Sequence, residues 1–170
     1  MLNIFAVKEN LKNLHAFARL MSLVAALRVC AEEDPRVKEM VESMPDNSKI
    51  YITTFPAKRT AVCEKVGNKL KLSLKRNVTV KEDAYIMFKS IDLAAPVLQN
   101  LMSVTDAFNQ SRLVIKGDIE LGIKVLKMFD IAQATYSTKL RRDKYLKEKP
   151  MSYNFSIKVR LSLLFRGWLW

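Results

Sequence analysis

The sequence predicts an α+β fold in which helices cover one face of a mostly antiparallel sheet. Two kinds of pattern support this prediction. Over residues 69–75, leucine alternates without error with lysine or serine, as in a strand that has one buried face. Apolar residues recur at helical spacing over residues 3–31 and again over residues 119–132. Together with the further strands described below, these patterns indicate one sheet and the helices that pack on it.

Residues 1–45 are predicted to form a helical extension. The helix over residues 3–31 ends at Glu32-Glu33-Asp34-Pro35, or this segment opens a short second helix over residues 37–41. We expect the extension to pack on the core, with contact to a partner or a membrane as the alternative. The apolar run from residue 14 to 30 is interrupted by charged residues and shorter than about 20 residues, so we predict neither a membrane span nor an export signal.

Four strand patterns follow a turn at residues 44–47. The first is residues 49–55, and the second contains residues 61–63. Gly67 and Asn68 tolerate positive φ, so they predict a hairpin-type turn into the third strand, residues 69–75. Residues 84–89 are apolar on both faces, which predicts a strand inside the sheet.

The stretch from Asp106 to Asp130 organises the second half of the domain. Before it, we expect a helix that is capped by Asp92 and contains Pro96 near its first turn. Residues 113–115 then have the composition of a buried strand, and Gly117-Asp118 provides a turn and a helix cap. The helix that follows is apolar over more than half of its surface. It must be buried on two sides, or it faces something apolar that is not protein.

Twelve residues form a pattern across this helix–strand–helix unit. They are Ala107, Phe108, Leu113, Ile115, Lys116, Gly117, Asp118, Ile119, Leu121, Gly122, Lys124 and Val125. The pattern resembles the closing signature of the sterol carrier protein family of small lipid-binding domains, with weaker similarity over residues 49–135. The departure is Ser111-Arg112, where the family usually has a glycine just before the strand. The resemblance implies a five-stranded sheet with helices over one face and an apolar tunnel between them.

Residues 139–170 form a basic tail. Nine of the 29 Lys and Arg residues lie there, against two acidic residues, within a chain of net charge +12. Residues 139–149 are predicted to be a basic linker that ends at Pro150. Residues 155–163 alternate between apolar and polar, as in a strand, although the choice between strand and helix stays open. The tail packs on the domain or contacts a membrane, for which we predict these residues: Lys158, Arg160, Phe165, Arg166, Trp168 and Trp170.

The sequence gives little support for a catalytic activity. His15 is the only histidine, and it has no acid or nucleophile in register. Cys30 and Cys63 have no metal-ligand spacing and suit a reduced, cytosolic setting as structural thiols. We therefore expect no enzyme activity, no metal and no cofactor. A nucleic acid is the partner that the sequence favours least, because the aromatic residues do not interleave with Lys and Arg.

Two observations predict a non-catalytic carrier of an apolar lipid, such as a fatty acyl chain, a phospholipid, a sterol or an isoprenoid. They are the resemblance and the large apolar surface of the helix over residues 119–132. The predicted lipid contacts are Phe88, Leu98, Leu101, Met102, Phe108, Ile115, Leu121, Val125, Met128 and Phe129. The expected domain is residues 46–138, located in the cytoplasm and peripherally on the inner face of a membrane. The alternative is an accessory or scaffold protein of a lipid or quinone biosynthesis complex, which would resemble the bacterial ubiquinone-synthesis proteins that carry this domain and would bind an enzyme partner through the N-terminal helix.

Overall fold

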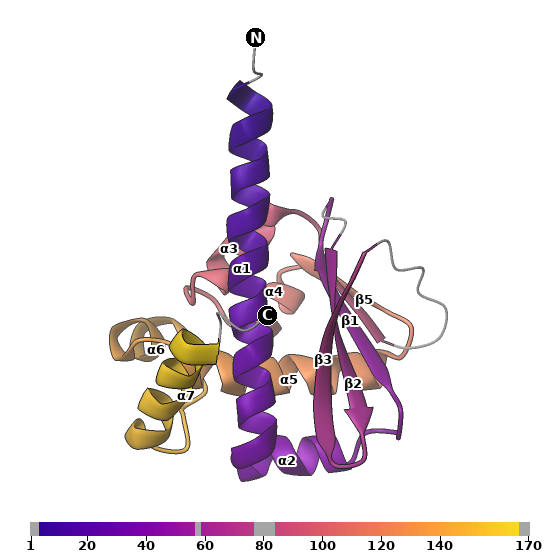
Figure 1. Ribbon diagram of the computed structural model, residues 1–170, viewed down its shortest axis with the longest axis vertical. Helices are drawn as coiled ribbons and strands as arrows, with labels where there is room; N and C mark the ends of the chain where they lie inside the picture. Colours follow the sequence, from indigo (N-terminus) through magenta and orange to yellow (C-terminus); the bar gives the residue numbers. More distant parts are fainter. Residues whose placement is uncertain (1–3, 57–58, 77–83, 167–170) are drawn as a thin grey trace.

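The computed structural model describes residues 4–56, 59–76 and 84–166 (Figure 1). Within these ranges the chain forms five strands and seven helices. In chain order they are α1 (Ile4–Glu33), α2 (Pro35–Glu42), β1 (Lys49–Thr54), β2 (Arg59–Val66), β3 (Lys69–Arg76), β4 (Ala84–Phe88), α3 (Ile91–Leu98), α4 (Val104–Asn109), β5 (Leu113–Lys116), α5 (Ile119–Tyr136), α6 (Lys139–Tyr145) and α7 (Tyr153–Arg166).

The five strands form one sheet in the order β3-β2-β1-β4-β5. β1 and β4 are parallel, and the other three neighbouring pairs are antiparallel. This confirms the predicted α+β class and the mostly antiparallel sheet. β4 lies between β1 and β5, so its apolar residues fit the interior position that the sequence predicts. On β3, Leu70 and Leu72 are buried, and Lys69 and Lys71 are exposed.

Five described residues have a positive φ, and three of them lie in the β2–β3 hairpin or on either side of β5. Gly67 has a φ of 57° in the β2–β3 hairpin, and Gly117 has a φ of 79° in the turn before α5. Asp118 caps α5 as predicted, because its Oδ1 accepts a hydrogen bond from Leu121 N at 2.9 Å. Ser111 has a φ of 56°, at the point where the sequence departs from the family pattern. The left-handed conformation occurs there in a residue other than glycine.

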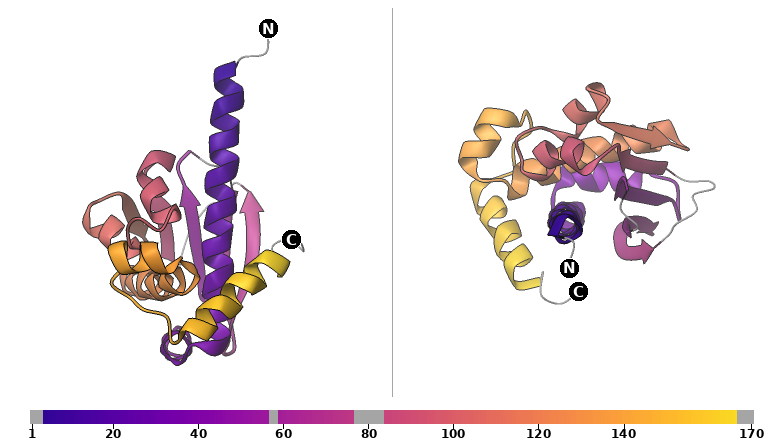
Figure 2. Two further views of the ribbon diagram at one scale, coloured as in Figure 1. Left: turned by 90° about the vertical axis from the view of Figure 1, so that its left-hand side faces the viewer. Right: turned by 90° about the horizontal axis from the view of Figure 1, so that it is seen from above.

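The helices gather on one side of the sheet (Figure 2). α1 packs against β2, β3 and α5, and its Leu20, Leu23 and Leu27 are buried in the main core. α5 contacts α1, α2, α4 and α7 as well as β4 and β5, so it is enclosed on more than two sides. Protein side chains therefore account for part of the apolar surplus of α5.

A close approach at Gly122 fixes α5 against the edge of the sheet. A β-carbon at residue 122 would collide with the side chain of Ile115 on β5. Only a residue without a side chain allows this separation, and both residues belong to the twelve-residue pattern over residues 107–125.

Two helix starts were tested by the structure. The prediction that Asp92 caps α3 is wrong, because Ser90 takes the cap position and its Oγ accepts a hydrogen bond from Leu93 N at 3.1 Å. Asp92 lies one residue inside the helix and forms an ion pair with Lys12 instead. Pro96 lies beyond the first turn of α3, near its end. Asp34 caps the short second helix, α2, and accepts a hydrogen bond from Arg36 N at 3.0 Å.

The basic tail is helical. The expected linker contains α6, and the strand predicted over residues 155–163 is wrong, because these residues lie in α7. Phe155 and Val159 are four residues apart, so in a helix they share the face that packs on α5, whereas Ile157 turns outward. Ser152 Oγ accepts a hydrogen bond from Phe155 N, and Ser156 Oγ donates one to Thr135 O. The tail is therefore packed onto the domain.

One segment of α1, Leu11–Glu33, is long and apolar enough to cross a membrane by length and composition alone. Half of its 18-residue apolar window is buried inside the protein, which is also the behaviour of a core helix.

Candidate lipid-binding groove

The predicted lipid contacts occupy different environments. Six are buried in the main core: Phe88, Leu98, Leu121, Val125, Met128 and Phe129. Three are partly buried against that core: Met102, Phe108 and Ile115. Leu101 is exposed. The structure therefore brings most of them into one cluster around α5, and the tunnel itself stays a prediction.

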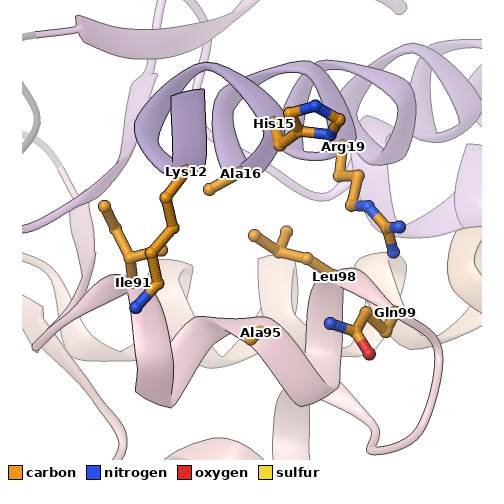
Figure 3. A pocket seen from close by; sticks show the side chains of 8 residues that line it. All are labelled: Lys12, His15, Ala16, Arg19, Ile91, Ala95, Leu98 and Gln99. Carbon is orange, nitrogen blue, oxygen red and sulfur yellow. The ribbon is translucent and has the colours of Figure 1, made fainter. Parts of the chain in front are cut away.

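A groove of about 260 Å³ lies between α1 and α3, and Leu98 is the predicted contact that lines it (Figure 3). Its walls are apolar where the helices face each other, through Ala16 on α1 and Ile91, Ala95 and Leu98 on α3. Its rim is polar and carries Lys12, His15 and Arg19 on α1 and Gln99 at the end of α3. The groove thus combines apolar walls with a cationic edge, as in sites that orient a mostly apolar ligand with a few polar groups.

The basic residues at the rim come from one side of α1. Lys12, His15 and Arg19 are three and four residues apart, which places them in a row along a helix. Lys12 forms an ion pair with Asp92 on α3. Arg19 has no acidic partner within the part of the chain that the structure describes. The rim therefore keeps an excess of positive charge.

Hydrogen bonds from α5 hold the wall that α3 provides. The side chain of Gln133 is fully buried, and its Nε2 donates to Val97 O and to Met102 O, each at 2.8 Å. Ser90 caps the start of α3, and Ser103 caps α4 through a hydrogen bond from Asp106 N. These bonds hold the start and the end of α3. The face of α3 that is turned toward α1 forms the wall of the groove.

Sequence reasoning missed the rim of the groove. A row of Lys, His and Arg on an amphipathic helix usually marks a solvated face. The signal that could have found it is the complete absence of acidic residues between Leu11 and Arg28, a segment that contains three Lys or Arg residues.

A second pocket, of about 480 Å³, is lined by both apolar and charged side chains. It lies between α4, α5 and the segment after α6, and its charged lining residues are Arg36, Asp106, Lys127, Asp130, Lys147 and Glu148. Asp130 Oδ1 accepts hydrogen bonds from Val104 N and Thr105 N, and burial raises the pKa of this carboxyl above its usual range. This balanced set of charges does not suit an acyl chain.

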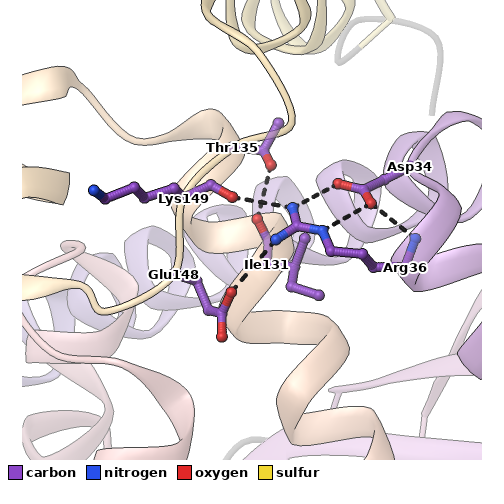
Figure 4. Close-up of polar contacts among 6 residues, drawn as sticks. All are labelled: Asp34, Arg36, Ile131, Thr135, Glu148 and Lys149. Atoms are coloured by element: carbon purple, nitrogen blue, oxygen red, sulfur yellow. Dashed lines mark hydrogen bonds and ion pairs between the residues drawn. The ribbon is translucent and has the colours of Figure 1, made fainter.

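Arg36 links two segments that lie far apart in the sequence, beside this second pocket (Figure 4). Its guanidinium donates to both carboxylate oxygens of the fully buried Asp34, at 3.1 and 2.8 Å, and to Lys149 O at 3.0 Å. Glu148 lies 3.5 Å from the same guanidinium. The hydrogen bond with Asp34 raises the pKa of Arg36. The segment between α6 and α7 is thereby fastened to the start of α2.

The predicted membrane contacts are only partly described. Lys158 pairs with Glu33 at 2.7 Å, and Arg160 donates to Tyr136 O at 3.1 Å and also to Ser137 O. Both cations thus serve contacts inside the protein. The side chains of Phe165 and Arg166, and all of Trp168 and Trp170, lie outside the described residues.

Both cysteines are buried and unpaired. Burial raises the pKa of the Cys30 and Cys63 thiols to about 12, so neither is a ready nucleophile near neutral pH. Among the residues that the structure describes, no group of three or more His, Cys, Asp or Glu residues could hold a metal ion.

Comparisons with known proteins found structural likenesses. No protein-family model matches the chain, and no curated protein matches it. A UbiJ-SCP2 ubiquinone synthesis protein is similar, with 11% identity, a TM-score of 0.45, and 63% of this chain and 84% of that chain covered. Palmitated SCP2L2 from Aedes aegypti has 16% identity, a TM-score of 0.42 and coverage of 64% and 91%. A conserved hypothetical protein from Thermus thermophilus, described with reference to sterol carrier protein, has 12% identity, a TM-score of 0.48 and coverage of 78% and 90%.

The descriptions of these proteins name the family that the sequence pattern resembles, and each of the three TM-scores is below 0.5.

Proposed function

We propose that this protein binds and carries an apolar lipid without catalysing a reaction, and that the groove between α1 and α3 is part of its binding site. The observation that carries the proposal is the combination of apolar walls at Ala16, Ile91, Ala95 and Leu98 with a cationic rim. The family pattern in residues 107–125 supports it independently. Each buried CH₂ of an acyl or isoprenoid chain would contribute roughly 0.8 kcal/mol, so affinity needs few polar contacts.

The groove is smaller than most binding sites for small molecules and cofactors, which span about 300–1,000 Å³. A volume of about 260 Å³ therefore suits one segment of a chain. The rest of a long ligand would extend toward the cluster around α5, where the other predicted contacts lie. Leu98 belongs to both the groove and this cluster.

The test measures uptake of a fluorescent fatty acid by the full chain. Ala95→Phe places a ring in the groove and should lower the affinity at least tenfold. Ala18→Phe is the matched control, because Ala18 is on α1 but exposed, and it should leave the affinity unchanged. Equal affinities for both variants would exclude the groove as the site.

A photoreactive fatty acid locates the ligand directly. Crosslinks within residues 91–99 would place the chain in the groove, whereas crosslinks confined to residues 121–129 would place it in the predicted tunnel. Native mass spectrometry of the purified protein should also show a co-purified apolar molecule. Protein that is empty and takes up neither probe would refute lipid carriage.

Docking to an anionic membrane is a second proposed activity, supported by the outer face of α7. Tyr153, Ile157 and Leu161 are four residues apart and exposed, so they form an apolar line on this helix. The Ile157→Ser and Leu161→Ser double variant should weaken sedimentation with vesicles that contain phosphatidylserine. This variant spares Phe155 and Val159, which a deletion of residues 151–170 would remove from the core.

A further inference from the structure

The groove between α1 and α3 has two chemically different ends. Lys12 and Ile91 lie at one end, and Arg19 and Gln99 lie at the other (Figure 3). At the first end the charge of Lys12 is compensated, because this residue forms an ion pair with Asp92. The groove therefore has a direction, which apolar walls alone would not give it.

Two arginines from different helices lie around Gln99 at the second end. The side chain of Arg19 extends from α1 toward the side of the groove that α3 forms (Figure 3). Arg141 on α6 donates a hydrogen bond from its Nη1 to Gln99 O at 2.9 Å. Neither guanidinium forms an ion pair with an acidic residue in the part of the chain that the structure describes.

Both positive charges act on one nearby group, the hydroxyl of Tyr136 at the end of α5. Burial raises the pKa of Tyr136 to about 12, while a hydrogen bond with Asn100 and the charges of Arg19 and Arg141 act in the opposite direction. The two arginines thus share one electrostatic environment.

The segments that meet at this end contribute no negative side chain. Residues 10–31, 93–105 and 131–142 contain no Asp or Glu. They include most of α1, α3 with the connection to α4, and the end of α5 with the start of α6. The positive charge at the Gln99 end is therefore available to an anion from outside the chain.

A guanidinium beside an apolar wall fits one kind of ligand end. Its planar array of N–H donors matches the oxygens of a carboxylate or a phosphate, and these charge-assisted hydrogen bonds are stronger than bonds to a neutral hydroxyl. Leu98, Ala95 and Ala16 would contact the chain segment next to such a head. A neutral lipid would use these apolar walls and gain nothing from the arginines.

We propose that the Gln99 end of the groove binds the anionic head of a lipid, a carboxylate or a phosphate, through Arg19, and that Arg141 adds positive charge to the same end. This inference rests on the proposed lipid carriage. It selects lipids with an ionised head over sterols and other neutral lipids.

The test compares lipids that share one chain and differ in the head. Binding of radiolabelled hexadecanoate and hexadecanol to the full chain is measured at pH 8. We expect hexadecanoate to bind about tenfold more tightly, the effect of one charge-assisted hydrogen bond. Because hexadecanol is the more hydrophobic of the two, burial alone would favour the alcohol. Hexadecyl phosphate is the third probe: tighter binding than hexadecanoate assigns a phosphate head, and weaker binding assigns a carboxylate.

Two variants locate the discrimination. Arg19→Gln should lower the affinity for hexadecanoate about tenfold and leave that for hexadecanol within about twofold. Arg28→Gln is the matched control, because it removes the same charge from α1 at a residue that does not line the groove and that pairs with Glu32. It should leave the affinity for hexadecanoate unchanged.

The direction of the ligand is tested separately. A hexadecanoate with a photoreactive group next to its carboxylate should crosslink at Leu98, Gln99 or Arg19, whereas one with the group at its methyl end should not. Crosslinks of the first probe at Ile91 or Asp92 would overturn the proposal.

Equal affinities for hexadecanoate and hexadecanol, or a preference that survives in Arg19→Gln, would also overturn it and leave lipid carriage intact. Binding of none of the three probes would instead refute lipid carriage itself. The two failures are therefore distinguishable.

Discussion

The two halves of α1 have similar residues and opposite surroundings. Leu20, Leu23 and Leu27 lie in the core, each at most 2% exposed, whereas Leu11 and Leu14 are 53% exposed. Both sets recur at helical spacing, and both belong to one continuous helix. The comparison teaches that a hydrophobic pattern identifies a face that needs a cover but does not identify the cover. In one half the cover is the same chain, and in the other half the leucines are open to solvent.

The largest expected difference between the halves is in thiol reactivity. With the pKa of Cys30 raised to about 12, its thiolate fraction at pH 8 should be lower than that of an exposed cysteine by a factor on the order of 10³. Because the raised pKa favours the neutral thiol in the folded protein, reactivity should appear only well above pH 8 or on unfolding. Iodoacetamide should therefore label Leu14→Cys, in a Cys30→Ala and Cys63→Ala background, far faster than it labels Cys30 in the native chain. Comparable rates would mean that the buried half opens readily.

The next largest difference is in stability. Leu27→Ala should lower the free energy of unfolding by about 3 kcal/mol, because it leaves a cavity among buried side chains. Leu14→Ala is the matched substitution on the exposed half and should change it by less than about 0.5 kcal/mol. Urea denaturation of both variants measures the contrast. A large loss for Leu14→Ala would show that the chain itself already covers the outer face.

A smaller loss of stability is expected at Asp34, which directly follows the buried half of α1. Asp34→Ala removes the cap of α2 and two hydrogen bonds to Arg36, at a cost of about 2 kcal/mol. Asp143→Ala removes an exposed carboxylate from α6 and should cost less than about 0.5 kcal/mol. Hydrogen exchange should also rise over residues 146–150 in Asp34→Ala alone, because Arg36 no longer holds this segment. Unchanged exchange there would mean that Arg36 does not fasten it.

The sequence could predict most of the fold because its local signals agree. The alternation on β3, the two-sided apolar composition of β4 and the Asp118 cap each indicate the element that forms. The tail was ambiguous for a geometric reason. Phe155 and Val159 are compatible with a period of two and with a spacing of four, and only the packing of α7 on α5 selects the helix.

The candidate site was less predictable. Leu98 could be named because apolar residues on α3 point to burial, but the opposite wall belongs to α1, more than 70 residues earlier in the chain. Sequence periodicity cannot tell which helix will lie beside which. Sequence periodicity also does not reveal that Lys12, His15 and Arg19 lie at the rim of an apolar groove, because the same residues suit any solvated surface.

The parallel pairing of β1 with β4 has a consequence for the order of folding. Residue 54 ends β1 and residue 84 begins β4, and the whole β2–β3 hairpin lies between them. The hairpin closes through a tight turn at Gly67, so it can form from local contacts alone, whereas β4 must first close a long loop. We expect amide protection to arise in β2 and β3 before it arises in β4. The strand at the inside of the finished sheet is then among the last to be added.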